Sequence, residues 1–357
     1  MKHEQMHTLY TKVAKPVLFS FDPELIHDLF TWFGETTSRF AFTRATIDSL
    51  FNYTNQTLAK EVNGIMYANP VGLAAGFDYN GRMAGILKHV GFGFNTVGTV
   101  TYSPYEGNPK PRMVRMPKSQ AILVNKGFKS EGVHKVVQRL NNPLLKDVTF
   151  GVSVGSSNIP SVDTIEKAIE DYIKTFDVLR GCENIKYYEL NISCPNTSLT
   201  ENFTVKKNYE ALFKEVTDLH LAKPVYIKMP NELVQEQIVE IVASAFTHGF
   251  NSFIFSNLIK DRANPYLDKD EVHAVSAYKG NFSGKPTSLG SSNHLRYFRS
   301  KYGKNIILVG CGGIFTPQDA FDKLNAGADL LQLVTGMIYE GPQLIGQINK
   351  HLSSSRP

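Results

Sequence analysis

Short apolar stretches alternate with amphipathic helical patterns along most of the chain. Eight strand-like runs occupy residues 72–76, 94–100, 149–155, 187–193, 224–230, 252–257, 305–310 and 330–336. Helical patterns lie between most of them, for example at 164–181, 209–221, 233–249 and 317–327. This alternation predicts a (β/α)₈ barrel, an α/β fold of the TIM type, and near-continuous apolar runs are typical of parallel strands covered by helices.

The first forty residues follow another pattern. Asp22, Pro23 and Glu24 suit a helix start, since aspartate caps well, proline fits the first turn and an acid favours the helix N-terminus. Apolar residues at 25, 26, 29, 30 and 33 then form one face. A further helix is expected over about 6–15. We therefore predict an N-terminal amphipathic helical extension, 1–40, before a barrel over 41–357. The extension either docks on the barrel or lies on a membrane.

Composition narrows the possible functions. The 357 residues carry a diffuse net charge of +5 without a basic block, which disfavours nucleic-acid binding. The spacing of Cys182, Cys194 and Cys311 suits neither a zinc site nor a disulfide framework. Reduced thiols in a cytosolic compartment are expected, with neither a secretory signal nor an apolar run long enough to span a bilayer. Asn63-Gly64, between short apolar stretches, predicts a hairpin before the barrel.

Polar residues gather at the C-terminal ends of the predicted strands, where barrel enzymes place their active sites. The set comprises Asp78, Tyr79, Thr99, Thr101, Ser153, Asn191, Ser193, Cys194, Asn196, Lys228, Ser256 and Asn257. It is rich in amides and hydroxyls and includes one lysine. Because it contains no cluster of histidines or carboxylates, no metal site is expected.

Two glycine-bearing loops follow the last two predicted strands. "GCGGIFTPQDA" spans 310–320 and "VTGMIYEGP" spans 334–342. Loops at these positions in barrels often bind phosphate through backbone N–H groups, and Gly312-Gly313 permits close approach of an anion. A phosphate-bearing cofactor such as FMN would then lie over the barrel mouth near Lys228. The alternative is that these glycines only make tight turns.

Several motifs occur together in order along the chain. They include "NPVGLAAGFDYNG" (69–81), "GFGFNTVGTVT" (91–101), "EGNPKPRMVRMP" (106–117), "NISCPNTS" (191–198), "IKMP" (227–230), "SGKP" (283–286), "GCGGI" (310–314) and "AGADLLQLVTG" (326–336). From about residue 9 to 350 the chain resembles the dihydroorotate dehydrogenases, flavoproteins of pyrimidine synthesis. The resemblance implies FMN-dependent oxidation of dihydroorotate to orotate.

The resemblance also implies site residues. Those expected to contact FMN are Ala75, Gly76, Thr99, Ser153, Asn191, Lys228, Ser256, Gly284, Gly312, Gly313, Val334 and Thr335. Those expected to contact the substrate are Tyr79, Asn125, Lys126, Gly127, Phe128, Asn191, Asn196 and Asn257. An asparagine amide offers two donors and an acceptor, which suits the imide edge of a pyrimidine. A cation at Lys228 would stabilise the reduced, anionic flavin.

The N-terminal stretch, including "DPELIH" (22–27), resembles the quinone-using branch of this family. In that branch a pair of helices forms a hydrophobic tunnel to the flavin, and His27 and Arg115 match tunnel-lining positions. The resemblance implies a quinone acceptor and peripheral attachment to the cytoplasmic side of the cell membrane. A monomer is favoured.

Cys194 matches the position of the family's general base. A thiol, with an ordinary pKa of about 8.5, ionises far more easily than a serine hydroxyl. Cys194 is therefore expected to remove the C5 proton of dihydroorotate while hydride leaves C6 for the flavin. Cys182 and Cys311 are interpreted as small buried apolar residues.

The chain departs from both branches. The quinone-using branch normally has serine at position 194 and a substrate-binding lysine at the position of Tyr79. The soluble branch has its lysine within 96–99, where this chain reads Thr-Val-Gly-Thr. Lys126 is the hypothetical replacement, and Lys129 a less favoured one. Val334, Leu258 and Ser153 replace a tyrosine, a threonine and an asparagine.

Three alternatives remain open. The same chemistry could use a soluble acceptor such as fumarate, with purely structural N-terminal helices. Tyr79 could accommodate a dihydropyrimidine that lacks the carboxylate. The chain could also be a flavin-binding or membrane-docking module without catalysis, although Cys194, Lys228 and the asparagines argue against this.

Overall fold

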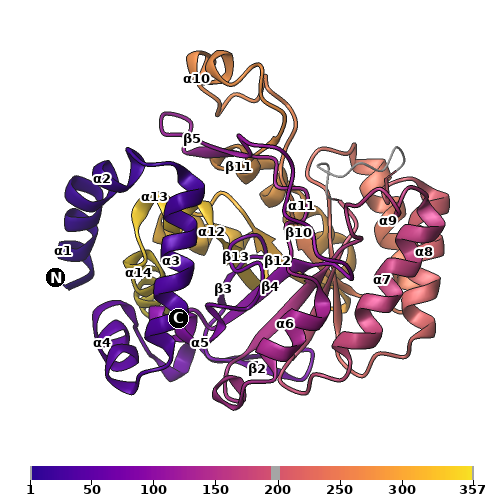
Figure 1. Cartoon of the computed structure of the whole chain (residues 1–357), viewed down its shortest axis with the longest axis horizontal. Helices are drawn as coiled ribbons and strands as arrows, with labels where there is room; N and C mark the ends of the chain where they lie inside the picture. Colours follow the sequence, from indigo (N-terminus) through magenta and orange to yellow (C-terminus); the bar gives the residue numbers. More distant parts are fainter. Residues whose placement is uncertain (1, 194–201, 356–357) are drawn as a thin grey trace.

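The predicted barrel is present in the structure, a computed structural model that describes residues 2–193 and 202–355. Within these ranges, eight parallel strands close in the order β3-β4-β7-β8-β9-β10-β12-β13 (Figure 1). Their bounds are β3 (Val71–Leu73), β4 (Phe94–Val100), β7 (Phe150–Val154), β8 (Tyr187–Asn191), β9 (Val225–Lys228), β10 (Ser252–Phe255), β12 (Ile307–Cys311) and β13 (Leu330–Leu333). Each strand overlaps one predicted run, because almost every strand residue is buried and therefore apolar or internally hydrogen-bonded.

Helices surround the barrel and alternate with its strands (Figure 1). The outer helices are α5 (Ala84–Val90), α6 (Val133–Leu140), α7 (Ile165–Leu179), α8 (Lys206–Asp218), α9 (Gln235–Thr247), α11 (Ser288–Tyr302), α12 (Pro317–Asn325) and α14 (Gln343–Ser354). The short helices α10 (Lys269–Ala274) and α13 (Thr335–Glu340) follow β10 and β13. The four helical patterns named from the sequence correspond to α7, α8, α9 and α12, with ends differing by a few residues.

The hairpin expected at Asn63-Gly64 is confirmed. Strands β1 (Lys60–Val62) and β2 (Ile65–Tyr67) pair antiparallel, with Val62 opposite Ile65. Asn63 has φ 53° and Gly64 has φ 70°. Two consecutive positive φ values are what a two-residue type I′ turn needs, and Asn-Gly tolerates them best.

A second, antiparallel sheet lies beside the barrel mouth and was not predicted. It consists of β5 (Met113–Met116), β6 (Ala121–Val124) and β11 (Asn281–Gly284), in the order β11-β6-β5. Residues 117–120 between β5 and β6 include Pro117, and Gln120 has φ 46°, so a turn signal was available in the sequence. This sheet matters for the site because β5 carries Arg115 and β6 leads directly to Lys126.

The N-terminal segment forms more helix than expected. Instead of one helix over about 6–15, residues 2–19 comprise α1 (Lys2–Leu9), a π-helical turn (Tyr10–Ala14) and α2 (Lys15–Phe19). Helix α3 (Pro23–Ser38) follows, and α4 (Ala41–Phe51) packs against both α3 and α5. The predicted start of α3 is confirmed, since the Asp22 carboxylate accepts hydrogen bonds from the backbone N–H groups of Glu24 (2.9 Å) and Leu25 (3.0 Å).

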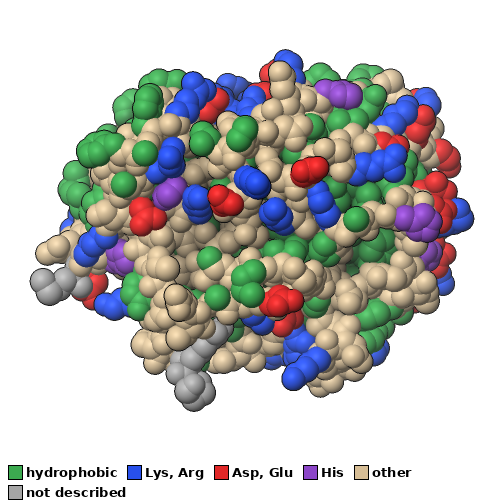
Figure 2. Space-filling view, turned by 90° about the horizontal axis from the view of Figure 1, so that it is seen from below, with side chains coloured by type: hydrophobic (Ala, Val, Ile, Leu, Met, Phe, Trp, Pro, Cys, Tyr) green, Lys and Arg blue, Asp and Glu red, His purple; other side chains and the backbone are tan. Residues whose placement is uncertain are grey.

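Helix α3 is seated on the barrel by its polar and small residues, whereas its large apolar residues face outward. The buried residues are Glu24, His27, Thr31, Gly34 and Thr37. A Cβ at Gly34 would lie 2.9 Å from Cε of Met83, so the helix approaches α5 closely there. Large apolar residues exposed along the N-terminal helices are Leu9, Val13, Val17, Phe21, Leu25, Leu29, Phe30, Trp32, Phe33, Phe40, Phe42 and Leu50. Figure 2 shows hydrophobic side chains gathered at the end of the molecule where these helices lie.

Candidate active site

One cavity of about 450 Å³ lies between the N-terminal helices, the antiparallel sheet and the mouth of the barrel. Its outer wall is apolar and includes Leu18, Phe19, Ile26, Phe30 and Phe33. Its inner wall is built from the C-terminal ends of barrel strands. Of the residues expected from the sequence, those lining it are Ala75, Gly76, Thr99, Asn191, Lys228, Val334, Thr335, Tyr79, Lys126, Gly127, Phe128, Asn257, His27 and Arg115.

The inner wall carries a connected set of hydroxyls and amides. Thr99 Oγ1 lies 2.9 Å from Ser153 Oγ and accepts from Asn191 Nδ2 at 3.2 Å. Asn257 Nδ2 donates to Asn191 Oδ1 (3.3 Å) and to Ser193 Oγ (2.9 Å). These contacts join four strand ends, so the two asparagine side chains are held in defined orientations toward the cavity.

Lys228, at the end of β9, is a buried cation on this wall with 5% of its surface exposed. Among the described residues it has no carboxylate partner, and its Nζ lies 3.9 Å from Cys311 Sγ. Burial raises the pKa of the Cys311 thiol, so this cysteine stays neutral beside the lysine. A buried ammonium group with so little compensation is suited to a negatively charged ligand.

Some expected cofactor residues lie near the cavity but not on its wall. Ser153 stands behind Thr99, while Ser256 Oγ accepts from Asn231 Nδ2 at 2.5 Å. Gly284, Gly312 and Gly313 also lie off the wall, although Ser283 and Thr335 beside them line it and their hydroxyl oxygens are 2.9 Å apart.

The glycine pair after β12 has a packing role. Gly312 and Gly313 have φ of 86° and 69°, a region that L-residues avoid. A Cβ would lie 2.3 Å from Thr287 Oγ1 at Gly312 and 2.4 Å from Ser288 Cβ at Gly313. The pair therefore brings the loop against the start of α11, which satisfies the tight-turn interpretation and leaves phosphate binding as a separate proposal.

Asn125 is not brought to the cavity. Its Oδ1 accepts from Asn108 Nδ2 at 2.9 Å, and its neighbours Val124 and Lys126 line the wall instead. Side chains on adjacent residues of an extended segment point to opposite sides, so the wall at this point is formed by 124 and 126. Cys194 and Asn196 lie outside the described residues.

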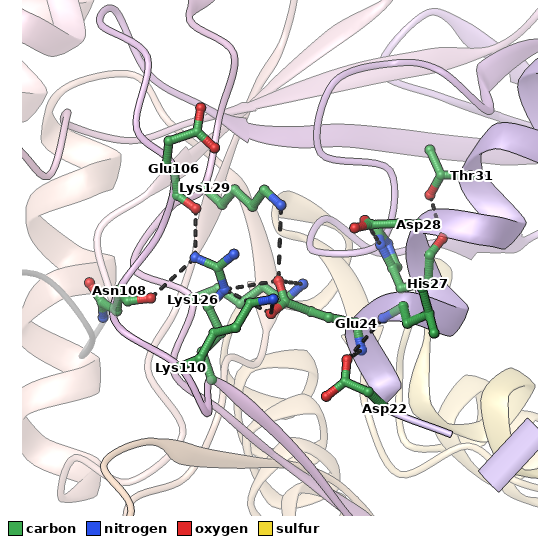
Figure 3. Close-up of polar contacts among 12 residues, drawn as sticks. Asp22, Glu24, His27, Asp28, Thr31, Glu106, Asn108, Lys110, Lys126 and Lys129 are labelled. Atoms are coloured by element: carbon green, nitrogen blue, oxygen red, sulfur yellow. Dashed lines mark hydrogen bonds and ion pairs between the residues drawn. The ribbon is translucent and has the colours of Figure 1, made fainter. Parts of the chain in front are cut away.

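Lys126 occupies the space beside Tyr79 where a family lysine is missing. Its Nζ lies 4.6 Å from the centroid of the Tyr79 ring, and that ring is 4.9 Å from the ring of His27. The same Nζ is 3.3 Å from Glu24 Oε1, a residue of α3 (Figure 3). Sequence reasoning missed Glu24, although an acid two residues after a capping aspartate first suggests only a favourable helix start.

The outer part of the cavity has two fixed polar groups. His27 Nε2 donates to the backbone oxygen of Phe77 at 2.7 Å. The Arg115 guanidinium stacks over the Phe19 ring at 4.6 Å and donates to the backbone oxygen of Phe21 at 2.8 Å. Burial lowers the pKa of Arg115, which still leaves it charged at neutral pH. Both groups stand among aromatic and aliphatic side chains, as expected for a site that binds an apolar molecule with polar atoms.

The chain matches the family profile described as "Dihydroorotate dehydrogenase" over residues 57–355. The chain belongs to the dihydroorotate dehydrogenase family. It is 35% identical over 348 residues to a protein of Christiangramia forsetii named dihydroorotate dehydrogenase (quinone), covering 96% of this chain and 98% of the relative. A Roseiflexus protein of the same name is 34% identical, with 98% and 94% covered. The chain is thus an oxidoreductase of this family, and the resemblance drawn from the motifs is confirmed.

Solved structures agree with the fold. The ligand-free dihydroorotate dehydrogenase of Eimeria tenella is 25% identical, with a TM-score of 0.80 and coverage of 93% of this chain and 94% of that one. The complex of the Eimeria tenella enzyme with ferulenol gives a TM-score of 0.81 at 24% identity, covering 94% and 93%. Enzymes of this family are flavin-dependent in general, so the cavity at the barrel mouth is examined next as a flavin site.

Proposed function

We propose that this dihydroorotate dehydrogenase uses FMN to oxidise (S)-dihydroorotate to orotate and passes the electrons to a membrane quinone. One observation carries the proposal. A single cavity connects the polar strand ends around Lys228 and Asn191 with the apolar space beneath α2 and α3. A flavin at the inner end would therefore be reachable by a polar substrate on one side and an apolar acceptor on the other.

The residues present fit a flavin. Gly76 lines the cavity with φ 103°, and no heavy atom lies within 4 Å of where its Cβ would be, so the backbone there faces open space. Ala75 beside it is also small, and Lys228 supplies a buried cation. FMN, when bound, would supply the hydride-accepting ring, while Thr99, Asn191 and Lys228 would hold and polarise its edge.

The phosphate of FMN is assigned to the glycine loops after β11, β12 and β13. The residues proposed are Ser256, Gly284, Gly312, Gly313 and Thr335, with Ser283 added because it lines the cavity. Their support is chemical, since glycine backbones and hydroxyls leave donors accessible to an anion. Asn231 would act indirectly by orienting Ser256.

The substrate ring is assigned to the amides of Asn191 and Asn257, together with Asn196 from outside the described residues. Cys194 would be the general base for the C5 proton. Its neighbour Ser193 supports this assignment, because Ser193 Oγ donates to the backbone oxygen of Lys228 at 3.0 Å and accepts from Asn257. The base therefore follows a residue anchored to both the cofactor side and the substrate side of the wall.

Lys126 is assigned to the substrate carboxylate. Replacing it with methionine is expected to raise the KM for dihydroorotate about tenfold or more, since a charge-assisted hydrogen bond to the carboxylate is lost. Steady-state kinetics with a saturating acceptor measures this. Lys110→Met is the matched control, because Lys110 approaches the same Glu24 but is exposed and away from the cavity. An unchanged KM in Lys126→Met would remove Lys126 from this role.

The exposed apolar side chains of α1 to α4 are proposed to lie on the membrane surface, so that quinone enters the cavity between them. No helix in the described ranges has both the length and the apolar character needed to cross a bilayer. Peripheral attachment to the cytoplasmic side of the cell membrane is therefore the proposed location.

An anaerobic titration tests the central proposal. The purified protein should carry a yellow flavin, and adding dihydroorotate without oxygen should bleach its absorbance. A quinone should then restore the colour, whereas fumarate should not. Bleaching followed by reoxidation with fumarate would favour the soluble acceptor, and a flavin that dihydroorotate cannot bleach would contradict the proposed substrate.

A further inference from the structure

Glu24 is a buried carboxylate from α3 that reaches basic residues of the barrel (Figure 3). Both of its oxygens accept from Arg112 Nε, at 2.8 and 2.9 Å. Lys126 Nζ lies 3.3 Å from it, and the Nζ atoms of Lys110 and Lys129 each lie 3.9 Å from it. One carboxylate thus faces four cations, all from the segment between β4 and α6.

Glu24 is ionised in this setting. Burial raises its pKa, but the hydrogen bond from Arg112 and the charges of Lys126 and Arg112 outweigh that effect, so the net pKa is lowered. Asp28, one turn further along α3, also faces Lys126 and Lys129 and is largely exposed. The cluster therefore keeps an excess of positive charge beside the cavity.

Lys126 is the member of this cluster that reaches the cavity wall as a buried residue. Its Nζ makes no hydrogen bond to any described residue, although it is within ion-pair distance of Glu24. The Tyr79 ring lies on another side of it, at 4.6 Å. A carboxylate and an aromatic face thus hold the ammonium group, while its N–H donors remain available to a ligand in the cavity.

We propose that Glu24 is a positioning residue for substrate binding, which holds the ammonium group of Lys126 against Tyr79 so that it meets the carboxylate of dihydroorotate. The inference rests on the proposed role of Lys126 and extends it to α3. It makes the seating of an N-terminal helix a condition for tight substrate binding, in addition to any role of that helix toward the quinone.

The effect of losing Glu24 follows from the charges. Without the carboxylate, Arg112, Lys126 and Lys129 would repel one another with no counter-charge between them. Lys126 would then rotate away or lose its proton, because an unpaired buried ammonium group is costly. Either change removes the cation from the substrate site, so binding weakens even though the local positive charge has nominally increased.

The test measures orotate binding to the FMN-loaded full chain by the change in flavin absorbance. Glu24→Gln is expected to weaken orotate about tenfold. The neutral methyl ester of orotate should bind as it does to the parent, because it offers no charge to Lys126. The matched control is Glu35→Gln, since Glu35 also lies on α3 and pairs with barrel residue Arg82 at 2.6 Å, but away from the cavity. This control should leave both ligands unchanged.

Three further results decide the matter. Glu24→Asp, which keeps the charge, should recover most of the orotate affinity, and all variants should match the parent in flavin content. Unchanged or tighter orotate binding in Glu24→Gln, with Lys126→Met still weak, would overturn the positioning role alone. Equal weakening of orotate and its ester would also overturn it, by showing a general distortion. Unchanged orotate binding in Lys126→Met would overturn the role of Lys126 itself.

Discussion

Replacing Cys194 with alanine should lower the rate of flavin reduction by dihydroorotate by about 10³-fold, the scale of a lost general base. Binding of orotate should change little, because Asn191, Asn257 and Lys126 remain. Anaerobic stopped-flow measurement of flavin bleaching separates the two quantities. A fall of less than about tenfold would show that another group removes the C5 proton.

The pH dependence identifies the thiol as the acid–base group. Below its ordinary pKa of about 8.5, the thiolate fraction of a cysteine rises with pH, so the parent's reduction rate should rise with it. Cys194→Ser is the matched variant, with nearly the same shape but a far less acidic hydroxyl. It should be slower at neutral pH, and a variant as fast as the parent there would show that acidity at this position is unimportant.

Removing residues 1–20 should lower quinone turnover about tenfold or more while leaving flavin reduction by dihydroorotate close to the parent rate. The deletion takes Tyr10, Leu18 and Phe19 out of the apolar wall, and each buried aromatic or aliphatic contact is worth about 1.5–3 kcal/mol. It retains Phe21, which accepts from Arg115, and the Asp22 cap of α3. Turnover with a water-soluble quinone and the half-reaction with dihydroorotate measure the two effects.

Deleting residues 1–40 is the informative comparison. It removes Glu24 as well, so orotate affinity should also fall about tenfold, in contrast to the shorter deletion. Quinone turnover that persists after either deletion would contradict the tunnel. Unaltered orotate binding after the longer deletion would show that Lys126 does not need α3.

The barrel could be predicted because its physical signals are local. The run at 94–100 is buried at every position, and the amphipathic pattern at 164–181 carries the apolar face that α7 packs inward. Asn63-Gly64 specifies its turn with two residues. Such features depend on neighbours in sequence, and the strand ends then place Thr99, Asn191, Lys228 and Asn257 together without further information.

What could not be predicted depends on contacts distant in sequence. The apolar stripe of α3 suggested inward packing as one alternative, yet Glu24, His27 and Gly34 form its seat and the stripe remains exposed or lines the cavity. Asn125 was expected at the substrate because its residue type suits a pyrimidine, but the extended backbone turns it toward Asn108. The ion pair of Glu24 with Lys126 joins residues about a hundred positions apart, and nothing in either local pattern announces it.

The position of Lys126 above Tyr79 also constrains how this site could have arisen. A lysine at position 79 would place a second ammonium group beside the first, within a cluster that has one buried carboxylate for four cations. An ancestor with lysine at 79 could therefore gain Lys126 only near the time it lost the older cation, and Glu24 had to be present to receive it. Ancestry would then have exchanged the three positions as a set, and α3 would have become tied to the barrel by descent as well as by packing.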